Sequence, residues 1–242
     1  MPALLATDAF PDMVAAVPER LRPQAAQATM AAVLRLRPGA WAPRLEGDGG
    51  GHFGLLVIEG LLARRVHVGR RACVELIGSG DLLRPWTTGA EGSSIDIDAR
   101  WVVQEETAIA VLDAGFAARV APYPQIAAWL VDRAVQRAMW LAFHLAIGQI
   151  TPLQTRLHVL FWYLADRWGR VTSEGVVVPL QLTHNVIGGL AGAHRPATTT
   201  ALGQLAARGL VQRRADGTWL LTGTAPPELG EAGVDAQIPI VR

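Results

Sequence analysis

The sequence contains no lysine, and all 22 of its basic residues are arginine. These arginines are spread over both halves of the chain, so we attribute them to the codon bias of the source and give them no functional weight. They stand against 21 acidic residues, which leaves a formal net charge of +1. This total alone does not indicate a polyanionic partner.

Cysteine is nearly absent, since Cys73 is the only one. A single thiol excludes disulfides within the chain. It also excludes an iron–sulfur cluster or structural zinc site that needs several cysteines of one chain. Cys73 is compatible with a reducing compartment but does not require one.

Long hydrophobic runs are also missing. The most apolar one, residues 138–147, is about half the length of the roughly 20 residues that span a membrane. The first ten residues have no basic segment and reach Asp8 before any useful apolar stretch, unlike a secretory signal. We expect a soluble, cytoplasmic protein with no membrane partner.

Catalytic motifs are missing as well. There is no Gly-x-Ser-x-Gly sequence, no phosphate-binding loop and no metal-ligand spacing. We therefore predict that the chain is not an enzyme and holds no cofactor. Half of the residues are hydrophobic and 18% are charged, as in folded domains. The 242 residues are enough for two domains, each with its own core.

The most informative stretch is Pro179–Leu205. Its apolar residues form two helical sets separated by Gly192, namely Leu182, Val186, Ile187 and Leu190, then Ala201, Leu202 and Leu205. This pattern predicts a helix, a tight turn and a second helix. Such a pair is either an ordinary hairpin in a core or the unit that places its second helix in the major groove of DNA.

Flanking features favour the DNA-binding unit. Thr151 is expected to cap a helix that has Pro152 at its first position, and the run Val176–Val178 indicates a short strand. Asp216-Gly217 predicts a hairpin turn between two apolar segments. Residues 150–222 hold 7 arginines against 3 acidic residues, a net charge of +4 that suits a surface facing phosphates. Together these features predict a winged helix-turn-helix.

The N-terminal part has a different texture. Glycines divide residues 37–113 into short apolar pieces, which are 53–60, 61–69, 73–80 and 101–113. Short strands with glycine turns at this spacing are typical of an all-β sandwich or barrel. We predict an α+β protein that begins with a double-stranded, jelly-roll-like β-roll.

A long helix is expected from Pro124 to Gly148. One apolar stripe steps along it by three or four residues, through Ile126, Leu130, Ala134, Ala138, Leu141 and Leu145. Further apolar surface at Trp129, Trp140 and Phe143 favours a helix that packs on its own domain and on a second copy of the chain. A core helix of a monomer is the alternative.

This order of parts resembles the Crp/Fnr family of bacterial transcription regulators. The resemblance covers residues 30–222 and rests on FGLLVIEGLLARRV (53–66), ELIGSGDLL (75–83) and LTHNVIGGLAGAHRPATTTALGQLAARGLV (182–211). It implies a cyclic-nucleotide-binding-like sensor roll at 1–120, a dimerisation helix at 121–149, a winged helix-turn-helix at 150–223 and a tail at 224–242.

The expected effector site departs from the family pattern. Members that bind cyclic AMP have a Gly-Glu step and an Arg-Ser/Thr-Ala segment after the Gly-Asp turn, but residues 87–98 contain no arginine. A buried cyclic phosphate would then lack its counter-ion, so we expect no dependence on cyclic AMP. An unknown small-molecule effector would meet Gly80, Asp81, Leu82, Arg84 and Arg100. Haem held by Cys73, His67 or Pro2 is a disfavoured alternative.

The resemblance also implies the DNA contacts. Thr183 and a protonated His184 would meet phosphates, Arg195 would read guanine, and the two wing arginines would add affinity through phosphates. The expected set is Thr183, His184, Arg195, Pro196, Thr198, Thr199, Thr200, Arg213 and Arg214. Family members use Arg-Glu-x-x-x-Arg, whereas here Pro196 and Thr200 replace the glutamate and the second arginine, so the family's base preferences should not carry over.

We therefore expect a homodimeric regulator that binds a near-palindromic DNA operator and has RNA polymerase as a further partner. The alternative is a ligand sensor whose winged domain mediates protein contacts instead of binding DNA.

Overall fold

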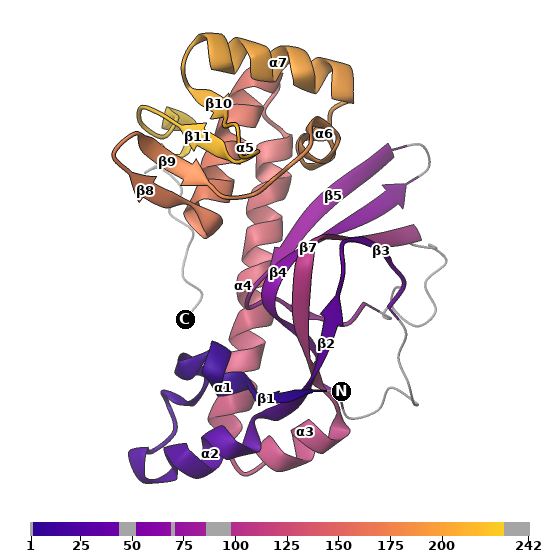
Figure 1. Cartoon of the computed structure of the whole chain (residues 1–242), viewed down its shortest axis with the longest axis vertical. Helices are drawn as coiled ribbons and strands as arrows, with labels where there is room; N and C mark the ends of the chain where they lie inside the picture. The colour runs from indigo at the N-terminus through magenta and orange to yellow at the C-terminus, as the bar shows by residue number, and fades with distance from the viewer. Residues whose placement is uncertain (1, 44–51, 69–70, 86–97, 230–242) are drawn as a thin grey trace, which may run out of the picture. The chain divides into compact units, whose positions relative to one another are not determined.

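The computed structural model describes residues 2–43, 52–68, 71–85 and 98–229 of the chain. It divides into two compact units, Met1–Leu141 and Ala142–Arg242 (Figure 1). Helix α4 (Pro124–Gly148) runs through the division, so its last seven residues belong to the second unit. No helix of the described ranges is long and apolar enough to span a bilayer.

The first unit joins small N-terminal helices to an antiparallel sheet, as an α+β fold requires. Its elements are β1 (Ala3–Leu5), α1 (Ala6–Ala9), η1 (Pro11–Val14), η2 (Glu19–Leu21), α2 (Arg22–Ala28), β2 (Met30–Leu36), β3 (Gly39–Trp41), β4 (Gly54–Val68), β5 (Arg71–Gly78), β6 (Leu82–Leu83), β7 (Asp98–Leu112) and α3 (Ala114–Val120). The main strand order is β1-β2-β7-β4-β5, with β3 pairing to β7 and β6 to β4.

The strands differ from the short pieces that the sequence predicts. Segments 53–60 and 61–69 join into the single strand β4, which has 15 residues, as does β7. Gly60, expected to end a strand, instead lies inside β4 with φ of 92°, in a stretch of register shifts against β7. Its Cα lies against Glu106 and Thr107 so closely that a Cβ would be 2.3 Å from the Glu106 carbonyl. The glycine thus bends the strand without ending it.

Two apolar clusters lie among the described residues of the first unit. One lies between strands of the roll and includes Val57, Ile77, Trp101 and Ile109. The other joins the N-terminal helices and α3 to the start of α4, through residues that include Met13, Phe116, Ile126 and Leu130. The predicted stripe on α4 is therefore divided. Its first two members are core residues of the roll unit, while Ala134, Ala138 and Leu145 are exposed.

The exposed side of α4 has its own spacing, which shares only Ala138 and Leu145 with the predicted stripe. Val131, Val135, Ala138, Ala142 and Leu145 follow each other at intervals of four and three residues and are all exposed. The exposed fractions of Val131, Val135 and Leu145 are 58%, 55% and 73%. We call these five residues the α4 seam. An alternating spacing of four and three is that of a coiled-coil interface.

The second unit holds the predicted helices and hairpin. Its elements after α4 are α5 (Leu153–Trp168), β8 (Arg170–Thr172), β9 (Gly175–Val178), α6 (His184–Ala191), α7 (Arg195–Ala207), β10 (Val211–Arg213), β11 (Trp219–Leu221) and η3 (Pro227–Leu229). The sheet order β10-β11-β9-β8 includes β8, a strand that the sequence did not indicate. Helix α5 begins one residue later than expected. Pro152, in an extended conformation, is its N-cap, and no side chain caps the helix.

Candidate functional sites

The helix-turn-helix is built by local signals. The Thr183 hydroxyl accepts a hydrogen bond from the Val186 amide and caps α6. Gly192 ends that helix in the left-handed conformation, with φ of 62°. The two helices approach closely at Gly188, where a Cβ would lie 2.9 Å from the Thr198 hydroxyl. The spacing of α6 and α7 therefore depends on glycine at this position.

Most of the predicted base-reading residues lie on the exposed side of α7. Arg195 is its first residue and Pro196 follows it in the first turn, where the missing amide costs no helical hydrogen bond. Arg195, Pro196, Thr199 and Thr200 are all exposed. The Thr200 hydroxyl donates a hydrogen bond to the Pro196 carbonyl at 3.2 Å.

Thr198 does not belong to that surface. Its side chain is fully buried, and its hydroxyl donates to the His194 carbonyl at 3.1 Å. The expectation that Thr198 contacts DNA is therefore wrong, because this face of α7 packs toward Gly188 of α6. The sequence contained the signal: Thr198 precedes the apolar pair Ala201 and Leu202 by three and four residues, so it shares their face.

His184 links the two helices of the motif. Its Nδ1 lies 2.9 Å from the Thr199 hydroxyl, and its ring lies 6.2 Å from that of Trp219 in β11. Partial burial lowers the pKa of His184, and the charges of Arg213 and Arg195 lower it further. The neutral imidazole is therefore favoured near pH 7 in the free protein, and the expected phosphate contact of His184 needs the protonated form. The effect of nearby arginines also shows that this surface is electropositive.

The wing follows the predicted hairpin. Gly217 has φ of 85°, and Asp216 accepts hydrogen bonds from the amide and hydroxyl of Thr218, which lower the pKa of its carboxyl group. Arg213 is exposed, with its guanidinium 6.0 Å from the Trp219 ring centre. Arg214 forms a 3.6 Å ion pair with Glu174. Arg213 thus presents its charge on the wing, whereas Arg214 shares its charge with a carboxylate of the β8–β9 hairpin.

The end of α4 is fastened to the helix-turn-helix. His144 Nε2 lies 2.7 Å from the Leu190 carbonyl, at the C-terminal end of α6. Arg156 of α5 donates to the neighbouring Ala191 carbonyl at 2.8 Å and to the Ile150 carbonyl at 2.7 Å. These bonds satisfy carbonyls that a helix end leaves without partners. The last turns of α4 therefore support the first helix of the motif.

The residues expected to meet an effector have structural contacts in the roll. Asp81 is buried and accepts a hydrogen bond from the Gly78 amide at 2.8 Å, and Gly80 takes φ of 85° in the same turn. The Arg84 side chain is exposed, but its guanidinium donates to the carbonyls of His52 and Phe53. Arg100 is exposed on β7, and Leu82 is half-buried.

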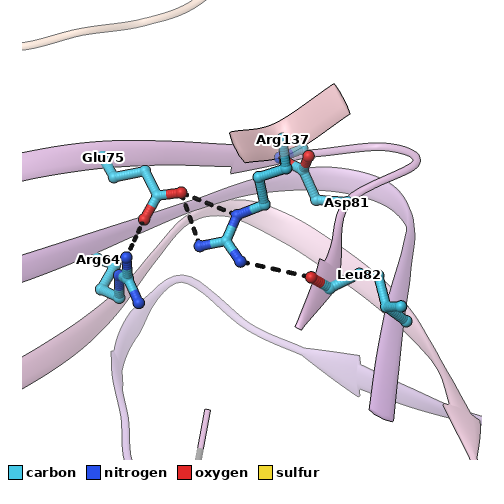
Figure 2. Close-up of polar contacts among 6 residues, drawn as sticks. Arg64, Glu75, Asp81, Leu82 and Arg137 are labelled. Atoms are coloured by element: carbon cyan, nitrogen blue, oxygen red, sulfur yellow. Dashed lines mark hydrogen bonds and ion pairs between the residues drawn. The ribbon is translucent and has the colours of Figure 1, made fainter. Parts of the chain in front are cut away.

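A buried ion cluster beside this turn was not predicted. Glu75 of β5 is 8% exposed. Its Oε1 accepts from Arg137 Nε and Nη2 at 2.9 and 2.7 Å, and its Oε2 pairs with Arg64 Nη2 at 2.8 Å (Figure 2). Arg137 also donates to the Leu82 carbonyl at 3.4 Å. The Glu75 carboxylate therefore joins β5 to β4 and α4, and Arg137 extends the cluster to β6.

Strand geometry separates two of the three residues considered for haem. In the β4–β5 pair Cys73 is opposite Val66, while His67 is opposite Ala72. Neighbouring residues of a strand point to opposite faces, so Cys73 and His67 cannot ligate one iron together. Among the described residues no three His, Cys, Asp or Glu side chains form a metal site.

Comparisons with known proteins agree with this arrangement. The family model of the Crp-like helix-turn-helix domain matches residues 155–225. A Crp/Fnr-family transcriptional regulator from Thermus thermophilus has a similar structure, with a TM-score of 0.58, 17% identity and coverage of 79% of this chain and 94% of that one. The chain has the fold of the Crp/Fnr regulators and carries their helix-turn-helix domain.

Other structures with the Crp/Fnr fold are equally distant in sequence. A mutant of CooA from Carboxydothermus hydrogenoformans has a TM-score of 0.61 and 17% identity over 80% of this chain and 84% of that one. FixK2 from Bradyrhizobium japonicum has a TM-score of 0.60 and 14% identity over 80% and 93%. No curated protein sequence matches the chain. The Crp/Fnr fold accounts for the presence of a roll and a winged unit. At such low sequence identity it does not determine which residues form the two candidate sites.

Proposed function

We propose that this chain is a homodimeric, sequence-specific DNA-binding transcription regulator that does not depend on cyclic AMP. The observation that carries the proposal is the exposed N-terminal part of α7. Arg195 is the first residue of that helix and shares one electropositive surface with Arg213. This surface belongs to a Crp-like helix-turn-helix domain. Such a regulator works in the cytoplasm, where it meets DNA and RNA polymerase.

The roles of the exposed residues follow from their chemistry. The planar guanidinium of Arg195 suits bidentate contact with guanine O6 and N7, which is worth roughly 1–3 kcal/mol of discrimination. Thr199 and Thr200, one turn further along, offer hydroxyl and methyl groups to phosphates or thymine. The capping position of Thr183 places the N-terminus of α6 where it can meet a phosphate.

Homodimerisation is supported by the α4 seam. Its residues expose apolar side chains along one line of a helix, and a second copy of the same seam would bury both. A dimer would carry two α7 helices for two successive major grooves, about 34 Å apart. The preferred DNA site would then be near-palindromic.

Independence from cyclic AMP is supported by the roll's arginines. Arg84, the arginine that follows the Gly-Asp turn in the sequence, is held by backbone carbonyls, and residues 87–98 contain no arginine. Burying a phosphate without a guanidinium would cost several kcal/mol. Added cyclic AMP should therefore leave DNA binding unchanged.

The test is selection of bound fragments from genomic DNA by the full chain, followed by fluorescence anisotropy on the selected duplex. We expect Arg195→Ala to weaken binding about 5- to 150-fold and to relax specificity at one base pair. Arg208→Ala is the matched control, because Arg208 is also exposed but lies at the other end of α7. Binding should also weaken steeply with salt. Equal effects of the two substitutions, or no dependence on salt, would refute DNA reading by α7.

A further inference from the structure

Within the Glu75 cluster, the Arg137 guanidinium has its hydrogen-bonding capacity used by residues of the roll. All three guanidinium nitrogens of Arg137 have acceptors within the roll unit, two on Glu75 and one on the Leu82 carbonyl. Figure 2 shows the Glu75 carboxylate between Arg64 and Arg137, with one oxygen toward each. An external anion could bind Arg137 only by displacing Glu75.

The charged groups of the Glu75 cluster are largely buried. Glu75 and Arg137 have only 10% and 16% of their side chains exposed, so their attraction is screened little by water. Loss of one partner would leave the other charge buried and unpaired, which is far more costly than loss of an exposed pair. The exposed pair of Arg35 and Glu59, with side chains 58% and 63% exposed, is a natural comparison within the same roll.

Arg137 lies on the helix that also supports the DNA-reading motif. It precedes His144 by seven residues, or about 10.5 Å along α4, and His144 contacts the Leu190 carbonyl of α6. The same helix therefore receives the ion cluster at one point and contacts the helix-turn-helix at another. A helix that is continuous through two contact points can carry coupling between them.

We propose that Glu75 is a positioning residue that acts as a built-in counter-ion: its carboxylate holds Arg137, and with it α4, so that DNA binding needs no anionic effector. The inference rests on the proposed DNA-binding function. Glu75 would then do more than stabilise the roll, because its carboxylate supplies the negative charge that a bound anion would otherwise supply.

The experiment removes the carboxylate and returns it from solution. In the full-length Glu75→Ala variant the void faces two arginines, and acetate has the charge and size to fill it. We expect DNA binding to weaken roughly 5- to 150-fold, the usual range of coupling between two sites. Acetate should restore it, while chloride at equal ionic strength should not. Glu75→Gln, which fills the void without charge, should be weakened but not rescued, and Glu59→Ala should behave as the wild type.

Hydrogen exchange of the amides at 133–141 separates this inference from the proposed function. If the wild type binds no DNA, the proposed function fails, yet faster exchange in Glu75→Ala that acetate reverses would still support the counter-ion role. Wild-type affinity in both Glu75 variants would overturn the inference, as would equal effects of acetate and chloride. If Glu75→Ala does not fold, the inference is tested by comparing the DNA affinities of Glu75→Gln and Glu59→Gln. Equal affinities of those two variants would overturn the inference.

Discussion

Val135→Asp offers the sharpest test of the α4 seam. Val135 is near the centre of the five seam residues, and its side chain is 55% exposed in the single chain. An aspartate there would remain in water in a monomer, so the free energy of unfolding of the monomer should change by less than about 0.5 kcal/mol. In a dimer that buries the seam, the same change would place two carboxylates near each other in an apolar interface.

The size of the effect follows from burial and charge. Complete burial of a valine is worth about 1.5–3 kcal/mol, so covering the exposed half of each Val135 stabilises the dimer by about 2 kcal/mol in total. Two unpaired carboxylates in the interface add a penalty of several kcal/mol. A loss of at least about 4 kcal/mol corresponds to a roughly 1000-fold increase in the dissociation constant of the dimer.

Sedimentation equilibrium of the wild type and of Val135→Asp measures the dissociation constant of the dimer directly. Val171→Asp is the matched control, since Val171 is a valine of β8 that is 88% exposed and lies outside the seam. We expect the control to dimerise like the wild type, and Val135→Asp to be monomeric and to lose affinity for a two-half-site duplex. A variant that still dimerises as tightly as the wild type would refute the assignment of the interface to α4.

Three further predictions concern single residues. A phosphate near His184 would raise its lowered pKa, so the DNA complex would take up a proton. DNA affinity should therefore rise as the pH falls below neutrality. In fluorescence anisotropy between about pH 5 and 8, the DNA affinity of His184→Gln should depend less on pH than that of the wild type. Gly60→Ala places a Cβ 2.3 Å from the Glu106 carbonyl and should cost at least about 3 kcal/mol in urea unfolding, and a loss below about 1 kcal/mol would show that the bend in β4 adapts. Gly192→Ala meets no atom within 4 Å, so only the left-handed backbone penalises it, by about 1–2 kcal/mol, and Gly192→Asn should cost less in the same assay.

The winged unit could be predicted well because its signals are local. The cap at Thr183, the left-handed Gly192 and the Asp216-Gly217 turn each act within four residues, so the sequence order alone places them. Strand β8 was missed because its three residues are exposed and have no apolar alternation. It becomes a strand by pairing with β9 across a two-residue turn, and its own residues carry no apolar pattern that indicates this hairpin.

The roll was predicted in class but not in detail. Gly60 resembles a turn glycine in sequence, and only its contact with Glu106 and Thr107 shows that β4 continues past it. The Glu75 cluster joins residues 62 positions apart, and no local pattern connects them. The division of the α4 stripe likewise depends on where the roll ends, which helical periodicity cannot tell.

The position of His144 has a consequence for exchanging modules between regulators of this fold. The compact winged unit begins at Ala142, within α4, and Ile147 is 3% exposed in it. A fragment cut in the linker after α4 would discard His144 together with this core isoleucine and leave the Leu190 carbonyl without its partner. A transplantable DNA-reading module therefore consists of the winged domain and the last two turns of the helix before it.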